Sequence, residues 1–229
     1  MQMLFGTNNV LELTKKNNIK GFLLFSSSAV YGEENTEEVV TEDYCGCINP
    51  LTQYACYSEG KRAAETMCYS WYRQYGVPVK IIRIFHTFGP GMDLNDGRMY
   101  VELVKSVVNG DNIVLTSKGE AKRYLCYISD AVRAYFRILL LGSSGEAYNV
   151  ANDEGYISVK EVSKMVANIY PEKHISVIYN LSEQNNISSK VKDMKVDVQK
   201  VRNLGWKPKV SVEEAFKRTI DSYIEGGNS

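Results

Sequence analysis

The segment VKIIRIFH (residues 79–86) decides the fold, because it is a short, mostly apolar run of the kind found in strands buried on both faces. A second such run, IKGFLLFSSS (19–28), comes earlier and ends in small polar residues. Between the two runs, TQYACYSEGKRAAETMCYSWYRQYG (52–76) has helical spacing, with Thr52 as a possible N-cap and Gly76 as a natural stop. This strand–helix–strand order predicts an α/β fold with a doubly wound parallel sheet.

The pattern becomes mixed beyond the Gly/Asp/Asn-rich loop GPGMDLNDGR (89–98). A polar stretch, NLSEQNNISSKVKD (180–193), is expected to be a mobile loop. The other elements expected are a helix over 8–18, a helix near 100–109, strands at NIVLT (112–116), RYLCYI (123–128) and EAYNVA (146–151), a helix opened by Ser129 and Asp130, and two helices with capping boxes at Ser158–Glu161 and Ser211–Glu214.

Composition and charge exclude several classes of function. The 229 residues carry 27 Lys+Arg and 27 Asp+Glu, so the overall charge does not favour nucleic acid or a membrane surface. The five cysteines are an odd number without a CxxC pair, and the two histidines lie far apart, so neither a disulfide framework nor a metal site is expected. With no long apolar run and no signal-peptide pattern, we expect a cytoplasmic protein.

Tyr57 and Lys61 lie four residues apart in the predicted helix 52–76, and therefore on the same face. An ammonium beside a phenol favours the phenolate, which is the form that a general base for an alcohol or sugar hydroxyl needs. A packed tyrosine beside a solvated lysine would have the same spacing. The segment FLLFSSSAVYG (22–32) favours the chemical interpretation, because a buried strand there brings serines to its carboxyl end, where open α/β sheets bind ligands. A simple turn is the structural alternative for the serines.

These two motifs, in this order, resemble the extended short-chain dehydrogenase/reductase family, and within it the NAD-dependent nucleotide-sugar epimerases and dehydratases. Members carry Ser/Thr-Ser-x-x-Val-Tyr-Gly followed by Tyr-x-x-x-Lys, matched here by SSSAVYG (26–32) and YSEGK (57–61). The resemblance extends over nearly the whole chain, through RIFHTFGPGM (83–92), DGR (96–98), GEAKRYLCYISDAV (119–132) and GEAYNVAN (145–152).

The resemblance implies a set of functional residues. Tyr57 would be the base, and Ser27 and Lys61 would assist it during oxidation of a sugar, with hydride passing to NAD. It further implies cofactor contacts from Ser26, Tyr57, Lys61 and Phe85, and substrate contacts from Ser28, His86, Arg98 and Arg123, with no metal. Many relatives have Asn at the position of His86, so a packed or loop-capping histidine is the alternative there, and a solvated surface charge is the alternative for Arg123.

The resemblance also implies a domain plan. Residues 1–95 would form a partial Rossmann-type NAD-binding domain that carries the catalytic helix. Residues 96–229 would form mainly a smaller mixed α/β substrate-binding region, with 145–152 returning to the Rossmann sheet. A homodimer is expected, because family members usually pair through the active-site helix and the helix before it.

Two departures from the family pattern bear on function. Dehydratases usually have Asp-Glu directly after the catalytic hydroxyl, and decarboxylases have Glu two residues after it, whereas Ser28 and Ala29 occupy these positions here. This favours an epimerase, with a UDP-glucuronate-type decarboxylase or a 4,6-dehydratase as alternatives. The sequence also lacks the family's Gly-x-x-Gly-x-x-Gly turn for the cofactor pyrophosphate. We therefore expect a shortened enzyme, a chain that needs a second chain to complete its sheet, or a noncatalytic nucleotide-sugar-binding relative.

Overall fold

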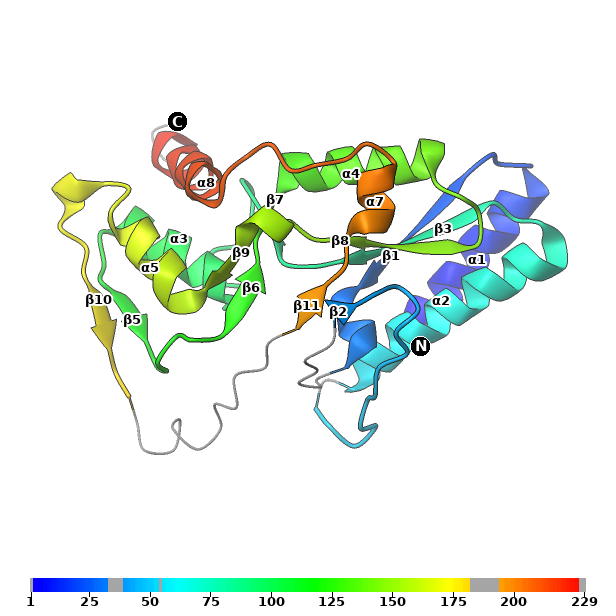
Figure 1. The fold of residues 1–229 in the computed structure, drawn as a ribbon, viewed down its shortest axis with the longest axis horizontal. Helices are drawn as coiled ribbons and strands as arrows, with labels where there is room; N and C mark the ends of the chain where they lie inside the picture. Colours follow the sequence, from blue (N-terminus) through cyan, green and yellow to red (C-terminus); the bar gives the residue numbers. More distant parts are fainter. Residues whose placement is uncertain (1, 33–38, 54, 182–193, 227–229) are drawn as a thin grey trace. The chain divides into compact units, whose positions relative to one another are not determined.

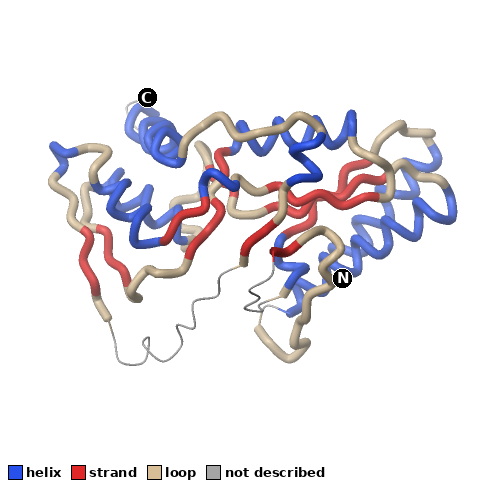
Figure 2. The backbone as a smooth tube through the Cα atoms, viewed as in Figure 1, coloured by secondary structure: helices blue, strands red, loops and turns tan. Residues whose placement is uncertain are grey.

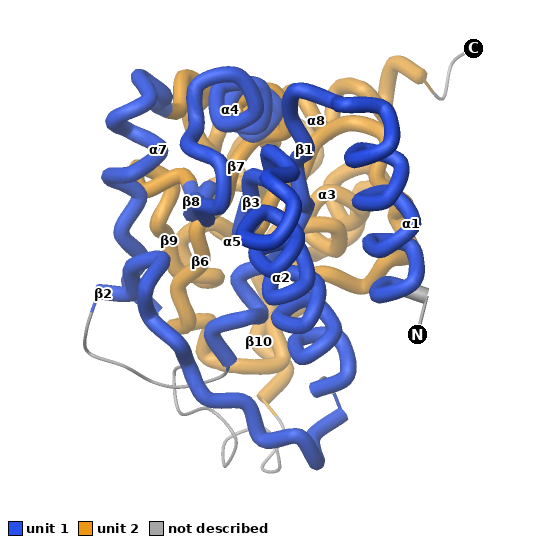
Figure 3. Tube along the Cα trace, turned by 90° about the vertical axis from the view of Figure 1, so that its right-hand side faces the viewer, with its two compact units in different colours: residues 1–85, 131–151, 194–207 blue, residues 86–130, 152–193, 208–229 orange. Residues whose placement is uncertain are grey.

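A computed structural model describes residues 2–32, 39–53, 55–181 and 194–226. The chain divides into two compact units, which Figure 3 distinguishes by colour. Unit 1 comprises Met1–Phe85, Ala131–Ala151 and Met194–Lys207, and unit 2 comprises His86–Asp130, Asn152–Asp193 and Pro208–Ser229. None of the described helices is long and apolar enough to cross a membrane.

A three-stranded parallel sheet forms the centre of unit 1 (Figure 1). Strands β1 (Phe22–Ser27), β3 (Val79–Ile84) and β8 (Glu146–Val150) pair in the order β1-β3-β8. Within the segment 145–152, the residues of β8 lie in the sheet beside β3. Both apolar runs form strands of one parallel sheet, which confirms the predicted α/β fold class.

Helices cover both faces of this sheet (Figure 1). On one face, α1 (Gln2–Lys16) and α2 (Ala55–Tyr75) bury Leu11 and Cys68 against Leu24 of β1. On the other face, Tyr135 of α4 (Ile128–Leu141) meets the ring of Phe25 edge-on, with 5.1 Å between the ring centroids. Consecutive strand residues point to opposite faces, so Leu24 and Phe25 each belong to a different layer. Unit 1 also contains a short parallel pair, β2 (Val39–Val40) with β11 (Lys195–Val196), and the short helices η1 (Ser28–Tyr31) and α7 (Gln199–Asn203).

Unit 2 packs three helices and short strand pairs around a separate core (Figure 2). Phe88 and Phe216 lie at its centre, with 4.5 Å between their ring centroids. The helices are α3 (Met99–Asn109), α5 (Val159–Ala167) and α8 (Val212–Gly226), with the short turns η2 (Asp153–Gly155) and η3 (Pro171–Lys173). The strand pairs are β4 (Thr87–Phe88) with β7 (Cys126–Tyr127), β5 (Ile113–Leu115) with β10 (Val177–Tyr179), and β6 (Lys122–Tyr124) with β9 (Tyr156–Ser158).

Of the two predicted ends of helix 52–76, the C-terminal one is confirmed and the N-terminal one is wrong. Gly76 ends α2 as expected, since its φ is +67° and its amide donates to the Tyr72 carbonyl at 2.9 Å. The N-cap prediction for Thr52 is wrong, because α2 begins at Ala55 and the Thr52 hydroxyl donates instead to the Asn49 carbonyl.

Of the other local predictions, one capping box is confirmed, the second forms only in part, and one predicted strand is wrong. The capping box of Ser158 and Glu161 is confirmed at the start of α5. At Ser211 the hydroxyl accepts from the Glu214 amide, but the Glu214 carboxylate binds Arg218 instead of completing the box. The predicted strand 123–128 is two strands, β6 and β7, which pair with different partners. The expected mobile loop 180–193 falls, from residue 182 onward, outside the described residues.

Candidate active site

Tyr57 and Lys61 lie together on the face of α2 that meets β1. The Lys61 ammonium donates to the Phe25 carbonyl at 2.7 Å and lies 5.8 Å from the centroid of the Tyr57 ring. Tyr57 is 46% exposed, so the side chain is open to solvent. The four-residue spacing has thus brought a phenol and an ammonium to the last residues of a parallel strand, the edge at which open α/β sheets bind ligands.

The serine run occupies the end of β1. Ser27 is its last residue, and the Ser27 hydroxyl caps η1 by accepting from the Ala29 amide at 3.2 Å. This bond uses an oxygen lone pair and leaves the hydroxyl proton for another acceptor. Ser28 is the first residue of η1 and is partly buried, whereas Ser26 is 3% exposed and donates to the Glu65 carboxylate.

Phe85 follows β3 directly and is buried in unit 1. Its amide donates to the Val150 carbonyl at 3.2 Å, and its ring lies 6.5 Å from that of Tyr31. The strand end therefore offers an aromatic wall close to η1. A contact between Phe85 and a nicotinamide stays a prediction.

The three basic residues predicted to bind substrate lie in unit 2. Burial lowers the pKa of His86 to about 4, and the nearby positive charges of Arg123 and Arg98 act in the same direction. Within the described part of the chain, the buried Nδ1 atom of His86 has no hydrogen-bond partner. Arg98 forms an ion pair with Asp96 and donates to the Tyr100 hydroxyl at 2.5 Å. Arg123 is turned toward its own strand, donating to the Lys122 carbonyl at 2.7 Å.

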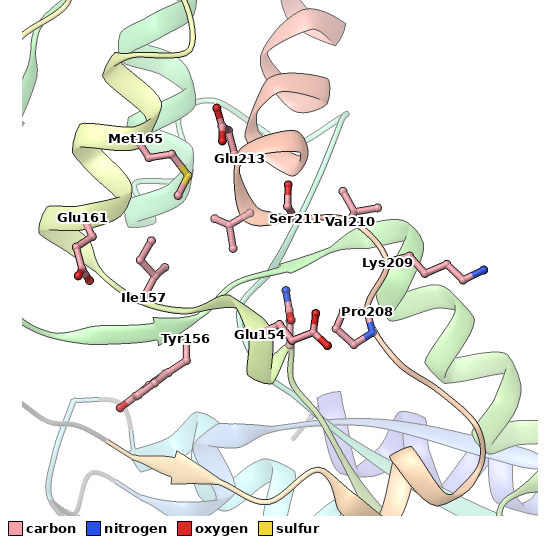
Figure 4. A pocket seen from close by; sticks show the side chains of 12 residues that line it. Glu154, Tyr156, Ile157, Glu161, Met165, Pro208, Lys209, Val210, Ser211 and Glu213 are labelled. Carbon is pink, nitrogen blue, oxygen red and sulfur yellow. The ribbon is translucent and has the colours of Figure 1, made fainter.

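Two cavities of unit 2 differ in their charge. One, of about 620 Å³, is lined in part by Arg123 and Lys105. The lining of the other includes Glu154, Glu161 and Glu213. Figure 4 shows the apolar side chains of Met165 and Ile157 near these carboxylates, and the Lys209 ammonium pointing away from Met165 and Ile157. A phosphate is attracted to cationic side chains and repelled by carboxylates. The first cavity is also lined by Glu102 and Asp111, so its charges balance, whereas carboxylates outnumber Lys209 in the second. Of the two, the Arg123 cavity is the less unfavourable for an anionic ligand.

A buried polar network beneath the Tyr57–Lys61 pair was not predicted from the sequence. Glu65, Arg83 and Tyr31 form its centre, with Arg83 donating to the Glu65 carboxylate and to the Tyr31 hydroxyl. Burial lowers the pKa of Arg83, but the hydrogen bonds to Glu65 outweigh that effect and raise it overall, whereas burial raises the pKa of Tyr31 to about 12. Two signals were present in the sequence: Glu65 continues the spacing of Tyr57 and Lys61, and Arg83 interrupts an apolar strand.

The described residues form no group of three or more His, Cys, Asp or Glu side chains that could hold a metal ion. For a nicotinamide cofactor, they fit one end of the molecule. Lys61 of α2 is bonded to β1 next to Ser26, Tyr57 lies beside Lys61, and Phe85 follows the neighbouring strand β3, so these four residues could line the nicotinamide end of the cofactor.

Comparisons with known proteins point to one enzyme family. Residues 2–151 match the model of the NAD dependent epimerase/dehydratase family. The chain is 33% identical over 212 residues to UDP-glucuronic acid decarboxylase 6 of Arabidopsis thaliana, covering 92% of this chain and 59% of that protein. It is 35% identical over 216 residues to UDP-glucuronic acid decarboxylase 1 of Xenopus tropicalis, covering 94% of this chain and 49% of that protein. The chain thus spans about half the length of the curated relatives it matches.

Solved structures share the fold. UDP-glucose 4-epimerase of Thermotoga maritima, solved with UDP-glucose, matches with a TM-score of 0.82 at 22% identity, over 99% of this chain and 70% of that one. UDP-glucuronic acid 4-epimerase of Bacillus cereus, solved with UDP-glucuronic acid and NAD, matches with a TM-score of 0.79 at 24% identity, over 98% of this chain and 67% of that one. Because the family model covers well over half of the sequence, the chain belongs to the NAD-dependent epimerase/dehydratase family.

Proposed function

We propose that this protein oxidises the sugar of a nucleotide-sugar, at C4, with NAD as its cofactor. The observation that carries the proposal is the hydrogen bond from Lys61 to the Phe25 carbonyl, which holds the Tyr57–Lys61 pair at the end of the strand that carries Ser27. The relatives that match most of this chain are nucleotide-sugar enzymes by name, which supports the same class of substrate.

In this proposal each residue has a defined role. Tyr57, as the phenolate, takes the proton from the sugar hydroxyl. Ser27 donates its free proton to the same oxygen and keeps it oriented. The Lys61 ammonium favours the phenolate and, with Ser26 and Phe85, contacts the cofactor. NAD, when bound, supplies the acceptor for the hydride that leaves the sugar carbon.

The nucleotide-diphosphate part of the substrate is assigned to the Arg123 cavity of unit 2. Arg123 offers a planar, permanently charged guanidinium and Lys105 a second positive charge, although Glu102 and Asp111 line the same cavity. The two basic residues are joined in the cavity wall by apolar residues, among them Met99 and Leu103, that suit a base. Arg98 is the weaker diphosphate ligand, since its guanidinium is already engaged by Asp96. His86, neutral near pH 7, and Ser28 are proposed as hydrogen-bonding contacts.

Two outcomes of the oxidation are open to this chain, each with an observation in its favour. Decarboxylation is favoured by the 33% and 35% identity to UDP-glucuronic acid decarboxylases. It is also chemically accessible, because a C4 ketone lies β to the C6 carboxylate of a uronic acid and stabilises the carbanion left at C5. Epimerisation is favoured by Ser28 and Ala29, which place no carboxylate directly after Ser27 to act as a further acid or base. We propose C4 epimerisation as the main activity, with decarboxylation of UDP-glucuronate as the second candidate.

A homodimer through α1 and α2 is part of the proposal. These helices expose large apolar side chains, including Phe5, Leu13 and Tyr69. Large exposed apolar side chains on two packed helices support a subunit interface there. Sedimentation of the purified chain at several concentrations measures its mass, and a strictly monomeric species would contradict this part.

The function is tested by incubating the protein with NAD and a panel of UDP-, dTDP-, CDP- and GDP-sugars, with products identified by mass spectrometry and NMR. An epimer with unchanged mass supports the first candidate, and carbon dioxide with a pentose product supports the second. Tyr57→Phe is expected to abolish turnover. The control Tyr69→Phe removes the hydroxyl of a similarly exposed tyrosine on the same helix and is expected to leave turnover unchanged. Equal turnover in the two variants would overturn the proposal.

A further inference from the structure

Glu65 is the third polar residue on the face of α2 that carries Tyr57 and Lys61. The three are spaced four residues apart, so they follow one another along one stripe of the helix. Glu65 differs from the other two in being only 9% exposed, beside the apolar side chains of Ala64 and Cys68. A buried carboxylate is costly unless it is fully paired.

Two strands supply the partners of this carboxylate. The Ser26 hydroxyl of β1 donates to Oε1 of Glu65 at 2.5 Å. From β3, Arg83 donates through Nε to Oε1 at 3.1 Å and through a terminal nitrogen to Oε2 at 2.7 Å. The far side of the Arg83 guanidinium is fixed as well, since it donates to the Tyr31 hydroxyl at 3.0 Å and to the Glu42 carbonyl at 2.6 Å.

The placement of Ser26 links this network to the proposed catalytic groups. Ser26 lies between Phe25, whose carbonyl binds Lys61, and Ser27, the proposed catalytic hydroxyl. Helix α2 is therefore hydrogen-bonded to two consecutive residues of β1, through Lys61 to Phe25 and through Glu65 to Ser26. Apolar packing is non-directional and leaves a helix free to slide or rotate slightly, whereas bidentate hydrogen bonds fix both motions.

We propose that Glu65 is a positioning residue, whose carboxylate clamps α2 to the ends of β1 and β3 and so fixes Lys61 and Tyr57 at the height of Ser27. The inference rests on the proposed function of those three residues. It assigns Ser26 and Arg83 as the other two parts of the clamp. An ionised carboxylate is required because it accepts from both partners and donates to neither.

The reactivity of Lys61 tests this proposal on the protein without cofactor or substrate. Lysines are labelled by reductive methylation with formaldehyde, and the rate at each site is followed by peptide mass spectrometry. In Glu65→Gln, and to a smaller degree in Ser26→Ala, the hydrogen bond of Lys61 to Phe25 is weakened, and its labelling is expected to speed up by about tenfold, the effect of one lost hydrogen bond. Ser26→Ala leaves the Glu65–Arg83 pair intact, so it serves if Glu65→Gln does not fold.

Two controls separate positioning from general loosening of the fold. Glu59→Gln neutralises an exposed carboxylate of the same helix, paired with Arg62 at 3.9 Å, and is expected to leave Lys61 labelling unchanged. Lys80 in β3 is 6% exposed and donates to the Leu139 carbonyl, so its labelling reports opening of the sheet. Faster labelling of Lys61 alone supports the clamp. An unchanged Lys61 rate, or Lys61 and Lys80 rising together, overturns it.

Turnover adds a second readout. In Glu65→Gln, kcat per folded enzyme is expected to fall with little change in KM, because Lys61 and Tyr57 are no longer held in the reactive position beside the sugar hydroxyl. A purely structural role would lower the amount of folded enzyme and leave kcat per folded enzyme unchanged. If instead Tyr57→Phe keeps full turnover, the proposed function fails while the labelling result still decides whether the clamp exists.

Discussion

The Lys61 ammonium donates to the Phe25 carbonyl at 2.7 Å, joining α2 to β1 across 36 residues of sequence. The same side chain lies beside the Tyr57 ring, so it has both a structural bond and a proposed catalytic role. Lys61→Met keeps the length of the side chain and removes its charge. We expect kcat to fall by about 10²–10⁴-fold, the usual contribution of a group that supports general-base catalysis.

Lys61→Arg is the informative companion, since it keeps the charge but replaces a compact ammonium by a planar fork. It is expected to recover only part of kcat. Thermal unfolding of both variants checks that the fold survives. Wild-type turnover by Lys61→Met would show that the ammonium serves packing alone.

Acid is expected to destabilise unit 2 through His86. Burial lowers the pKa of His86 to about 4, below its ordinary value, so the unfolded chain binds a proton between pH 6.5 and 4 that the folded chain does not. Stability therefore rises with pH across this window and is lost as the pH falls through it. At pH 5 the loss from this residue is about 2 kcal/mol relative to pH 7.

The measurement is urea unfolding at pH 7 and pH 5, for the wild type and for His86→Asn. The variant cannot titrate in this range, so its loss of stability between the two pH values is expected to be smaller by that amount. His174→Asn serves as the control, because His174 is in the exposed turn after η3. An identical pH dependence in the wild type and His86→Asn would contradict the prediction.

The sequence predicts the sheet and the Tyr57–Lys61 pair because both follow from local periodicity. Strands β1 and β3 are apolar runs, and a four-residue helical spacing needs no tertiary information. The partners of Glu65 and Tyr31 could not be predicted from local spacing, because Tyr31 bonds to Asn149 across 118 residues. The split of 123–128 into β6 and β7 was missed for the same reason, since one continuous pattern hides a change of pairing partner.

Gly145 is expected to tolerate no side chain. Its φ is +83°, and a Cβ there would come within 2.3 Å of the Tyr72 ring. Gly76 has a similar φ of +67°, but a Cβ there would meet no atom of the described residues within 4 Å, so it isolates the backbone cost. We expect Gly76→Ala to lower the free energy of unfolding by about 1 kcal/mol and Gly145→Ala by about 2–4 kcal/mol, the difference being steric overlap with Tyr72.

Denaturant unfolding of the two variants measures this difference directly. Both glycines lie in unit 1, Gly76 directly after α2 and Gly145 directly before β8. Equal losses in the two variants would mean that Tyr72 moves aside without cost.

Arg123 is expected to carry most of the affinity for the diphosphate. Arg123→Gln keeps a polar side chain of similar reach but removes the charge and the bidentate donor pair. Charge-assisted hydrogen bonds of this kind contribute about 1.5–3 kcal/mol, so the Kd for UDP is expected to rise by about 10- to 150-fold. The measurement is calorimetric titration with UDP, which requires neither NAD nor turnover.

Two controls test whether the loss of UDP affinity is specific to Arg123: a variant of a second arginine and the salt dependence of binding. Arg218→Gln removes an equally charged residue that is paired with Glu214 on α8, and it is expected to leave the Kd unchanged. Because ionic contacts weaken as salt rises, the wild-type affinity should also fall with ionic strength more steeply than that of Arg123→Gln. If both arginine variants bind UDP as the wild type does, the diphosphate lies elsewhere and the assignment of the Arg123 cavity is wrong.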